Sequence, residues 1–231
     1  MGTLEIVKRP GQRPAESSAE QCRRKFLRFF PRGFEDGKYF DWERSYKLLA
    51  HQQWQQVLNR KAFQELLKLE KFTEIASEAI RVESRTNLLF SFEKMALRDA
   101  VREREGAETF SRGLYDMLFG GASPAKRFDR WCGAIESLPR KQTRVLTHPV
   151  VTVFPFIAQP ERHIFLKPNV TRKAAAEYGF DFSYKPKPGW DTYSSLLEFA
   201  QVIKRDLARV KPRDMIDVQS FIWVIGSEEY R

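Results

Sequence analysis

The fold class is decided by residues 144–190, which read RVLTHPVVTVFPFIAQPERHIFLKPNVTRKAAAEYGFDFSYKPKPGW. Six of the 12 prolines fall here, and they break the helical spacing that the flanking segments keep. Phe180, Phe182 and Tyr184 alternate with polar residues, the period of a half-buried strand. Ile-Phe-Leu between turn residues also suits a short strand. The stretch therefore predicts a two-stranded β element, residues 162–167 against 180–184.

Residues 150–156 are ambiguous within this stretch. Their β-branched side chains favour a strand, whereas Thr147 before His148-Pro149 resembles a capped helix start, which we favour. Pro155 requires a bend in either structure. After them, Thr171 is expected to cap a short helix that Gly179 ends.

The flanking segments carry apolar residues at helical spacing. Expected helices include 18–30, 42–58 capped by Asp41, 88–101, one opened by Ser123-Pro124, one capped by Asp191 and a last one capped by Asp214. The helix at 88–101 is apolar over a wide arc and is expected at the centre of the core. The predicted fold class is mostly α with a small β element: a single compact helical domain, residues 17–231, with a two-stranded insertion. Residues 1–16 are predicted to be a flexible basic N-terminal arm.

The chain is strongly basic, with 40 Lys and Arg against 30 Asp and Glu, a net charge of +10 and a pI near 9.7. Residues 1–40 (+4) and 141–190 (+5) supply nearly all of the excess. Such clustering attracts polyanions, most simply nucleic acid. Neither a membrane-spanning run nor a secretory signal is apparent, so we expect a cytoplasmic protein with no membrane partner.

Known catalytic motifs are not found. Two isolated cysteines and three scattered histidines do not match a metal-ligand spacing, and the phosphate-binding, dinucleotide-binding and nucleophile-elbow patterns do not occur. We predict no cofactor and no metal, and the catalytic residues, if there are any, are unknown. A buried Glu93 could ligate a metal, but pairing with Arg85, Lys94 or Arg98 is the favoured interpretation.

Positive and aromatic side chains lie near one another in sequence within the central stretch. Positive charge around an aromatic ring can hold phosphate while the ring stacks a base. On a strand at 162–167, His163 and Lys167 would flank Phe165 on one surface. The alternative is that Phe165 packs inward while Lys167 extends to water. The candidate nucleic-acid-binding residues are Arg144, His148, Arg162, His163, Lys167, Arg172, Lys185 and Trp190.

Polar residues also interrupt the last helix, where Asp217, Gln219 and Ser220 alternate with apolar ones. Such residues usually face solvent or hold a loop by hydrogen bonds. A binding role for Gln219 is the other interpretation.

Three segments, residues 87–93 (NLLFSFE), 162–171 (RHIFLKPNVT) and 214–223 (DMIDVQSFIW), resemble a family of uncharacterised bacterial proteins. The resemblance covers most of residues 20–230. It implies a bacterial, cytoplasmic, single-domain protein and carries over no functional residue.

The leading hypothesis is a nucleic-acid-binding protein, with DNA as the first candidate, acting in bacterial DNA repair or defence through residues 144–190. One alternative is a helical subunit that docks to a protein partner through exposed aromatic and arginine residues. The other is an enzyme, a nuclease or a glycosylase, with a site near His163.

Overall fold

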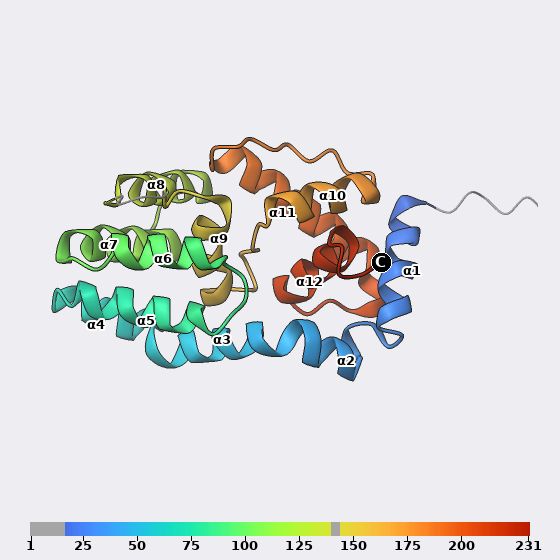
Figure 1. The fold of residues 1–231 in the computed structure, drawn as a ribbon, viewed down its shortest axis with the longest axis horizontal. Coiled ribbons are helices and arrows are strands. Elements are labelled where there is room, and N and C mark those ends of the chain that lie inside the picture. The colour runs from blue at the N-terminus through green and yellow to red at the C-terminus, as the bar shows by residue number, and fades with distance from the viewer. Residues whose placement is uncertain (1–16, 140–143) are drawn as a thin grey trace, which may run out of the picture.

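The computed structural model describes residues 17–139 and 144–231, and all regular structure in that part of the chain is helical (Figure 1). The arm predicted for residues 1–16 lies outside the described residues. The α-helices are α1 (Ser18–Phe29), α2 (Gly37–Tyr39), α3 (Ser45–Val57), α4 (Arg60–Lys68), α5 (Phe72–Ser84), α6 (Ser91–Ala100), α7 (Arg104–Phe119), α8 (Pro124–Ser137), α9 (His148–Ala158), α10 (Pro168–Tyr178), α11 (Trp190–Asp206) and α12 (Met215–Gly226). The short helices are η1 (Gly33–Glu35), the π-helical η2 (Phe40–Arg44) and η3 (Ala208–Val210).

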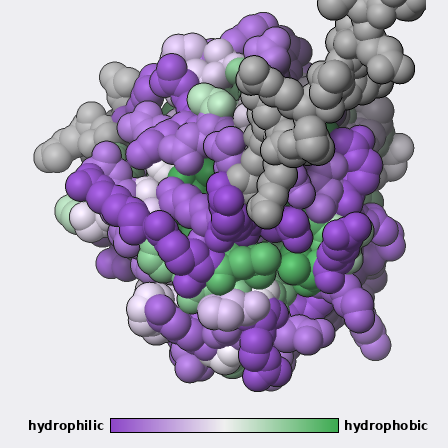
Figure 2. Space-filling view, turned by 90° about the vertical axis from the view of Figure 1, so that its right-hand side faces the viewer, coloured by the Kyte–Doolittle hydropathy of each residue, from purple (hydrophilic) through white to green (hydrophobic). Residues whose placement is uncertain are grey.

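The helices fall into two groups joined by α9 and by the long α2–η2–α3 helix. In Figure 1, α4 to α8 lie on the left, α1 and α10 to α12 lie on the right, and α9 stands between them. Buried hydrophobic side chains from both groups form a single cluster. The end of the molecule that carries α1 presents mainly hydrophilic side chains, interrupted by a hydrophobic band (Figure 2).

The predicted two-stranded element is wrong, because residues 162–167 and 180–184 form no ladder with each other. Backbone N–H groups in both segments donate to helix hydroxyls instead: Ile164 to Tyr193, Leu166 to Thr152, Ser183 to Ser195 and Lys185 to Thr192. Ile164 and Leu166 are buried, so their donors must be satisfied, and a hydroxyl meets that need without a neighbouring strand. The period-two pattern was therefore read correctly as non-helical and incorrectly as a sheet.

Helix α9 confirms the helical interpretation of residues 150–156. Thr147 accepts a hydrogen bond from the N–H of Val150, as an N-cap should, and all 11 helical residues are buried. Pro155 has no N–H for the carbonyl oxygen of Val151, four residues earlier. That oxygen accepts from Trp131 Nε1 of α8 at 2.8 Å. A tryptophan side chain thus replaces the missing backbone bond at the centre of the core.

The helix expected at 42–58 begins earlier than predicted. Asp36 caps it by accepting from the N–H of Lys38, and the helix continues from Gly37 through the π-helical turn η2 into α3. A π-helical turn inserts an extra residue and re-aims the side chains that follow, and such turns are frequent at functional sites. Here Glu43 and Lys47 point from this helix towards α12 and are buried.

The helix expected at 88–101 is shorter and less central than predicted. It begins at Ser91, and Phe90, Phe92 and Met95 expose 53%, 51% and 64% of their surface. Within α6 only Leu97 and Ala100 of the apolar residues are buried, while Leu88 and Leu89 before it and Val101 after it are buried as well. The wide apolar arc is therefore divided between buried residues that belong to the core and an exposed hydrophobic edge formed by Phe90, Phe92 and Met95.

Candidate functional site

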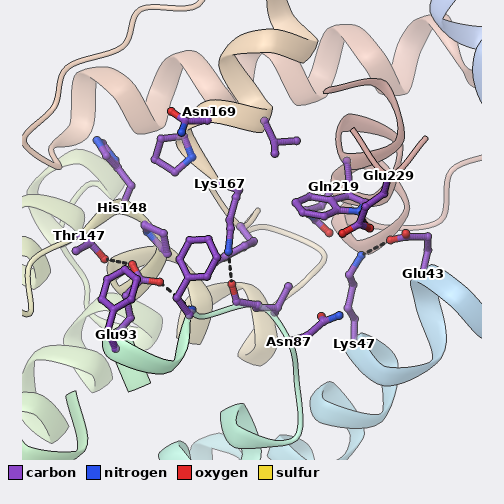
Figure 3. Close-up of a pocket in the computed structure, with 18 of the residues that line it drawn as sticks. Glu43, Lys47, Asn87, Glu93, Thr147, His148, Lys167, Asn169, Gln219 and Glu229 are labelled. Carbon is purple, nitrogen blue, oxygen red and sulfur yellow. Dashed lines mark hydrogen bonds and ion pairs between the residues drawn. The ribbon is translucent and has the colours of Figure 1, made fainter. Parts of the chain in front are cut away.

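A cleft of about 1010 Å³ lies where the two groups of helices meet (Figure 3). Its walls come from η2 and α3, the loop before α6, the first residues of α9 and α10, and α12. The volume is at the upper end of the range for small-molecule pockets. Aromatic rings line much of it: Trp42, Tyr46, Phe90, Phe92, Phe165, Tyr184, Trp223 and Tyr230.

One end of the cleft is built on a buried ion pair. Lys47 Nζ lies 3.2 Å from Glu43 Oε2 and donates to Ser220 Oγ at 2.8 Å, and Tyr230 donates to the other Glu43 oxygen at 2.6 Å. Burial lowers the pKa of Lys47, and the charge of Glu43 opposes that shift. Because every carboxylate oxygen has a donor, the pair is a rigid base for this end of the site.

Asp217 anchors α12 behind the same end. Its carboxylate accepts from Tyr39 at 2.6 Å, from Arg44 at 2.8 Å and from Arg213 at 2.8 Å. Burial tends to raise its pKa, but these donors outweigh burial and leave the pKa below its usual value. The network joins the α2–η2–α3 helix to α12 and so fixes the width of the cleft.

Gln219 is the polar group of α12 without a complete set of partners. The residue is 4% exposed, and its buried Oε1 has no hydrogen-bond partner within the described part of the chain. Figure 3 shows Gln219 at the wall of the cleft, near Glu229. A buried amide oxygen without a donor costs free energy unless a ligand supplies one.

Lys167 occupies the middle of the cleft (Figure 3). Its Nζ donates to the carbonyl oxygen of Leu88 at 3.0 Å and stands 3.6 Å from the centre of the Phe90 ring. Burial lowers its pKa, an effect that the charge of Glu93 opposes. Among the described residues, no carboxylate lies within 4.0 Å of this ammonium group, so an anionic ligand would be its first ionic partner.

The other end of the cleft joins α6 to α9. Glu93 accepts from the N–H of Phe90 at 3.1 Å and from the Thr147 hydroxyl at 2.8 Å, so hydrogen bonds rather than the expected ion pairs hold it. His148 Nε2 lies 2.8 Å from the carbonyl oxygen of Lys185 and must carry the ring proton, since a carbonyl only accepts. Burial lowers the pKa of His148 and keeps the ring neutral.

Five of the sequence-predicted residues gather at or beside the cleft. Arg144, His148 and Lys167 line it. The Arg172 guanidinium lies 5.0 Å from the ring centre of Tyr184, a lining residue. Lys185 offers its carbonyl oxygen to His148, while its ammonium group is exposed and paired with Asp191.

The other three lie elsewhere. Trp190 packs against Phe128 at the start of α11, and Arg162 is exposed beside a second hollow. His163 is 8% exposed, and its Nδ1 lies 3.1 Å from the Tyr193 hydroxyl. The expected surface of His163, Phe165 and Lys167 is therefore incorrect, because only Phe165 and Lys167 reach the cleft. An enzyme site centred on His163 gains no support from this position.

Glu43 and Lys47 carry no sequence motif that marks them as functional residues. Their signal is an acid and a lysine one helical turn apart beside aromatic residues, a pattern that surface helices share. Gln219 was noticed and left open. Of the three polar residues in α12, none faces solvent, and Asp217 and Ser220 hold neighbouring elements by hydrogen bonds.

Comparisons with protein-family models, curated proteins and solved structures found no match. Within residues 17–139 and 144–231, no group of three or more His, Cys, Asp or Glu side chains is placed to hold a metal ion. No helix in the same ranges has both the length and the apolar character needed to cross a membrane.

Proposed function

We propose that this chain is a nucleic-acid-binding protein that holds an unpaired nucleotide in the cleft. The observation that carries the proposal is the buried Gln219 Oε1, which has no hydrogen-bond partner among the described residues, in a cleft lined by aromatic rings and by Lys167. DNA is the first candidate, and a cytoplasmic role in bacterial DNA repair or defence belongs to the same proposal.

The aromatic lining supports a ligand with a planar ring. Phe90 and Phe92 stack on each other with ring centres 5.5 Å apart and an interplanar angle of 17°, and half of each surface is exposed. Trp42 is 56% exposed on the same cleft, with the Lys38 ammonium 4.1 Å from its ring centre. Stacking on such rings contributes about 1–3 kcal/mol per base in single-strand binding proteins.

The charges of the cleft support a ligand with phosphate groups. Among the described residues Lys167 makes no ion pair, although the charge of Glu93 acts on it, and Arg144 lines the cleft with His148. Lysine and arginine contacts to phosphate release counterions, which makes such binding weaken steeply with salt.

Gln219 supports recognition of a base edge. A glutamine amide offers one acceptor and one donor side by side, the arrangement that pairs with the N6 and N7 atoms of adenine. The nearby carboxylate of Glu229 accepts from Trp223 Nε1 and adds acceptor character to this end of the cleft. We therefore expect bases that carry an exocyclic amino group to bind best. Their edges are free in a single strand, whereas bases in a duplex are stacked and must be flipped out first.

The test is fluorescence anisotropy with labelled single-stranded DNA, single-stranded RNA and duplex DNA at several salt concentrations. We expect single strands to bind more tightly than the duplex, with adenine-rich strands ahead of thymine-rich ones. The variant Lys167→Met should flatten the logarithmic salt dependence by about 0.7. No micromolar binding to any of the three at low salt would refute the proposal.

Two further variants separate binding from folding. Phe92→Ala should weaken binding by about 1–3 kcal/mol. Its matched control, Met95→Ala, removes another exposed apolar side chain of α6 that does not line the cleft, and should bind normally. Gln219→Leu should weaken adenine-rich binding by about 1–3 kcal/mol without loss of stability, because the amide oxygen has no partner to lose. Normal binding by a destabilised Gln219→Leu would show that the amide is structural.

A further inference from the structure

A second hollow, of about 320 Å³, lies at the opposite end of α9 from the cleft. It forms where the end of α7 meets the first residue of α4, a side chain of α8 and the residues that follow α9. Three arginines line it: Arg60 from α4, Arg127 from α8 and Arg162 from the turn after α9.

These arginines have no carboxylate partners. Within the described residues, none of the three makes an ion pair, and Glu161 is the one carboxylate on the wall. Arg130, one turn along α8 from Arg127, differs in that its Nε and Nη2 both donate to the Asp116 carboxylate. Three positive charges around one hollow repel one another, and the single carboxylate of Glu161 leaves an excess that a bound anion or solvent can offset.

Buried polar atoms in the hollow are also unsatisfied. Arg127 donates from Nη1 to the carbonyl oxygen of Met117 at 2.8 Å, which fixes the guanidinium, while its buried Nε has no partner in the described chain. Gln159 donates to the carbonyl oxygen of Leu118 at 3.2 Å, and its buried Oε1 has no partner there either. A ligand that fits must accept from arginine and can donate to Gln159.

We infer that this hollow binds a phosphate group. Phosphate oxygens accept the paired N–H donors of a guanidinium, and arginine is the side chain most often used where this geometry matters. Singly protonated phosphate, or a hydroxyl beside a phosphate ester, also supplies the donor that Gln159 lacks. The positive field is not cancelled within the protein: after burial, the charges of Arg127 and Arg162 are the causes that lower the pKa of neighbouring His163.

This inference does not depend on the proposed function. The phosphate could belong to a small molecule or to the backbone of a nucleic acid, and both share the chemistry that the arginines recognise. The size of the hollow suits a single phosphate or pyrophosphate rather than a whole nucleotide chain.

The first experiment measures binding of inorganic phosphate and pyrophosphate to the full chain. Calorimetry and thermal melting in a phosphate-free buffer would follow a titration, with sodium chloride at matched ionic strength as the reference. We expect a saturable rise in melting temperature with phosphate that chloride does not produce. The double variant R60A/R162A should fold, since both side chains are exposed, and should bind phosphate at least about tenfold more weakly. The matched control is Arg102→Ala, an exposed arginine paired with Asp99 far from the hollow in sequence, which should bind as the natural chain does.

Equal effects of phosphate and chloride, or unchanged phosphate binding by R60A/R162A, would overturn the inference. The source of the phosphate is then decided by competition at constant ionic strength. If phosphate weakens oligonucleotide binding to the natural chain but not to R60A/R162A, the hollow takes a backbone phosphate. If phosphate binds and oligonucleotide binding is unaffected, the hollow serves a small phosphate ligand. Phosphate binding without any oligonucleotide binding would support this inference while refuting the proposed function.

Discussion

His163 should make the folded protein sensitive to mild acid. Its ring is buried, and burial together with the charges of Arg127 and Arg162 lowers its pKa from 6.5 to about 4. The Tyr193 hydroxyl accepts the N–H of Ile164, which leaves its own proton for Nδ1 of a neutral ring. A proton added to Nδ1 would remove that bond and place a third positive charge beside two arginines.

The size of the effect follows from the two pKa values. The unfolded chain takes up the proton as the pH falls below about 6.5, whereas the folded chain does so only at about pH 4. Between these values the unfolded state binds more protons, so the free energy of unfolding decreases as the pH is lowered. Between pH 7.5 and 4.5 the free energy of unfolding should fall by about 2.5 kcal/mol from this residue alone. The loss is complete only below the folded pKa.

The assay is urea unfolding of the natural chain and of His163→Phe at several pH values. Phenylalanine keeps the ring beside Tyr193 and cannot titrate, so the variant should lose about 2.5 kcal/mol less than the natural chain over this pH range. His51→Asn is the control, because it removes a histidine that bonds to the backbone of Ile157 and leaves the surroundings of His163 intact. Identical pH profiles for the natural chain and His163→Phe would refute the reasoning and return His163 to the list of accessible, functional residues.

Two further predictions concern stability. Lys47→Ala should lower the free energy of unfolding by about 3–5 kcal/mol, because it leaves the Glu43 carboxylate buried without its ionic partner. In the same urea titrations, the double variant Lys47→Met with Glu43→Gln should recover much of that loss. Equal instability of the single and double variants would contradict this account. Gly226→Ala should cost about 2–3 kcal/mol, since a Cβ there would lie 2.1 Å from the carbonyl oxygen of Val170 in α10. Gly133 lies within α8 where a Cβ would meet no neighbouring atom, so Gly133→Ala should instead stabilise the protein by up to about 1 kcal/mol in the same assay. A similar loss of stability in both variants would argue against close packing of α10 on α12.

Some helix ends could be predicted from the sequence because their chemistry is local, but three expected caps are wrong. Asp41, Thr171 and Asp191 each lie inside a helix that begins earlier, at Gly37, Pro168 and Trp190. The expected caps Ser123, Thr147 and Asp214 each accept the backbone bond that defines an N-cap, and Gly179 ends α10 with φ +78°. A cap needs only a short polar side chain and the few N–H groups after it, all within one turn. Tertiary contacts do not change that requirement.

The strands could not be excluded from the sequence because the alternative partners are single hydroxyls on helices, 7 to 29 residues away, which no periodicity marks. The hydroxyls that replace strand partners belong to α9 and α11, and a buried Thr152 or Ser195 looks like any other small polar residue on a helix. The cleft could not be predicted from the sequence either, because its residues come from distant segments. Glu43 and Lys47 precede Gln219 by more than 170 residues, and only the packing of α3 on α12 brings them together.

The basic residues of the central stretch divide for a reason that the chain itself supplies. Arg144 and His148 precede or begin α9, whereas Arg162 and His163 follow it, and a helix of 11 residues separates its ends by about 16 Å. Residues that are close in sequence therefore lie at opposite ends of a buried helix, with the cleft at one end and the arginine hollow at the other. A ligand that engages both ends must span the length of α9 across the surface, which a single nucleotide cannot do and a strand of several nucleotides can. Oligonucleotides of increasing length separate these cases. If affinity rises with length and then levels, and the rise is lost in R60A/R162A, one strand reaches both sites. If affinity does not depend on length, the two sites bind their ligands independently.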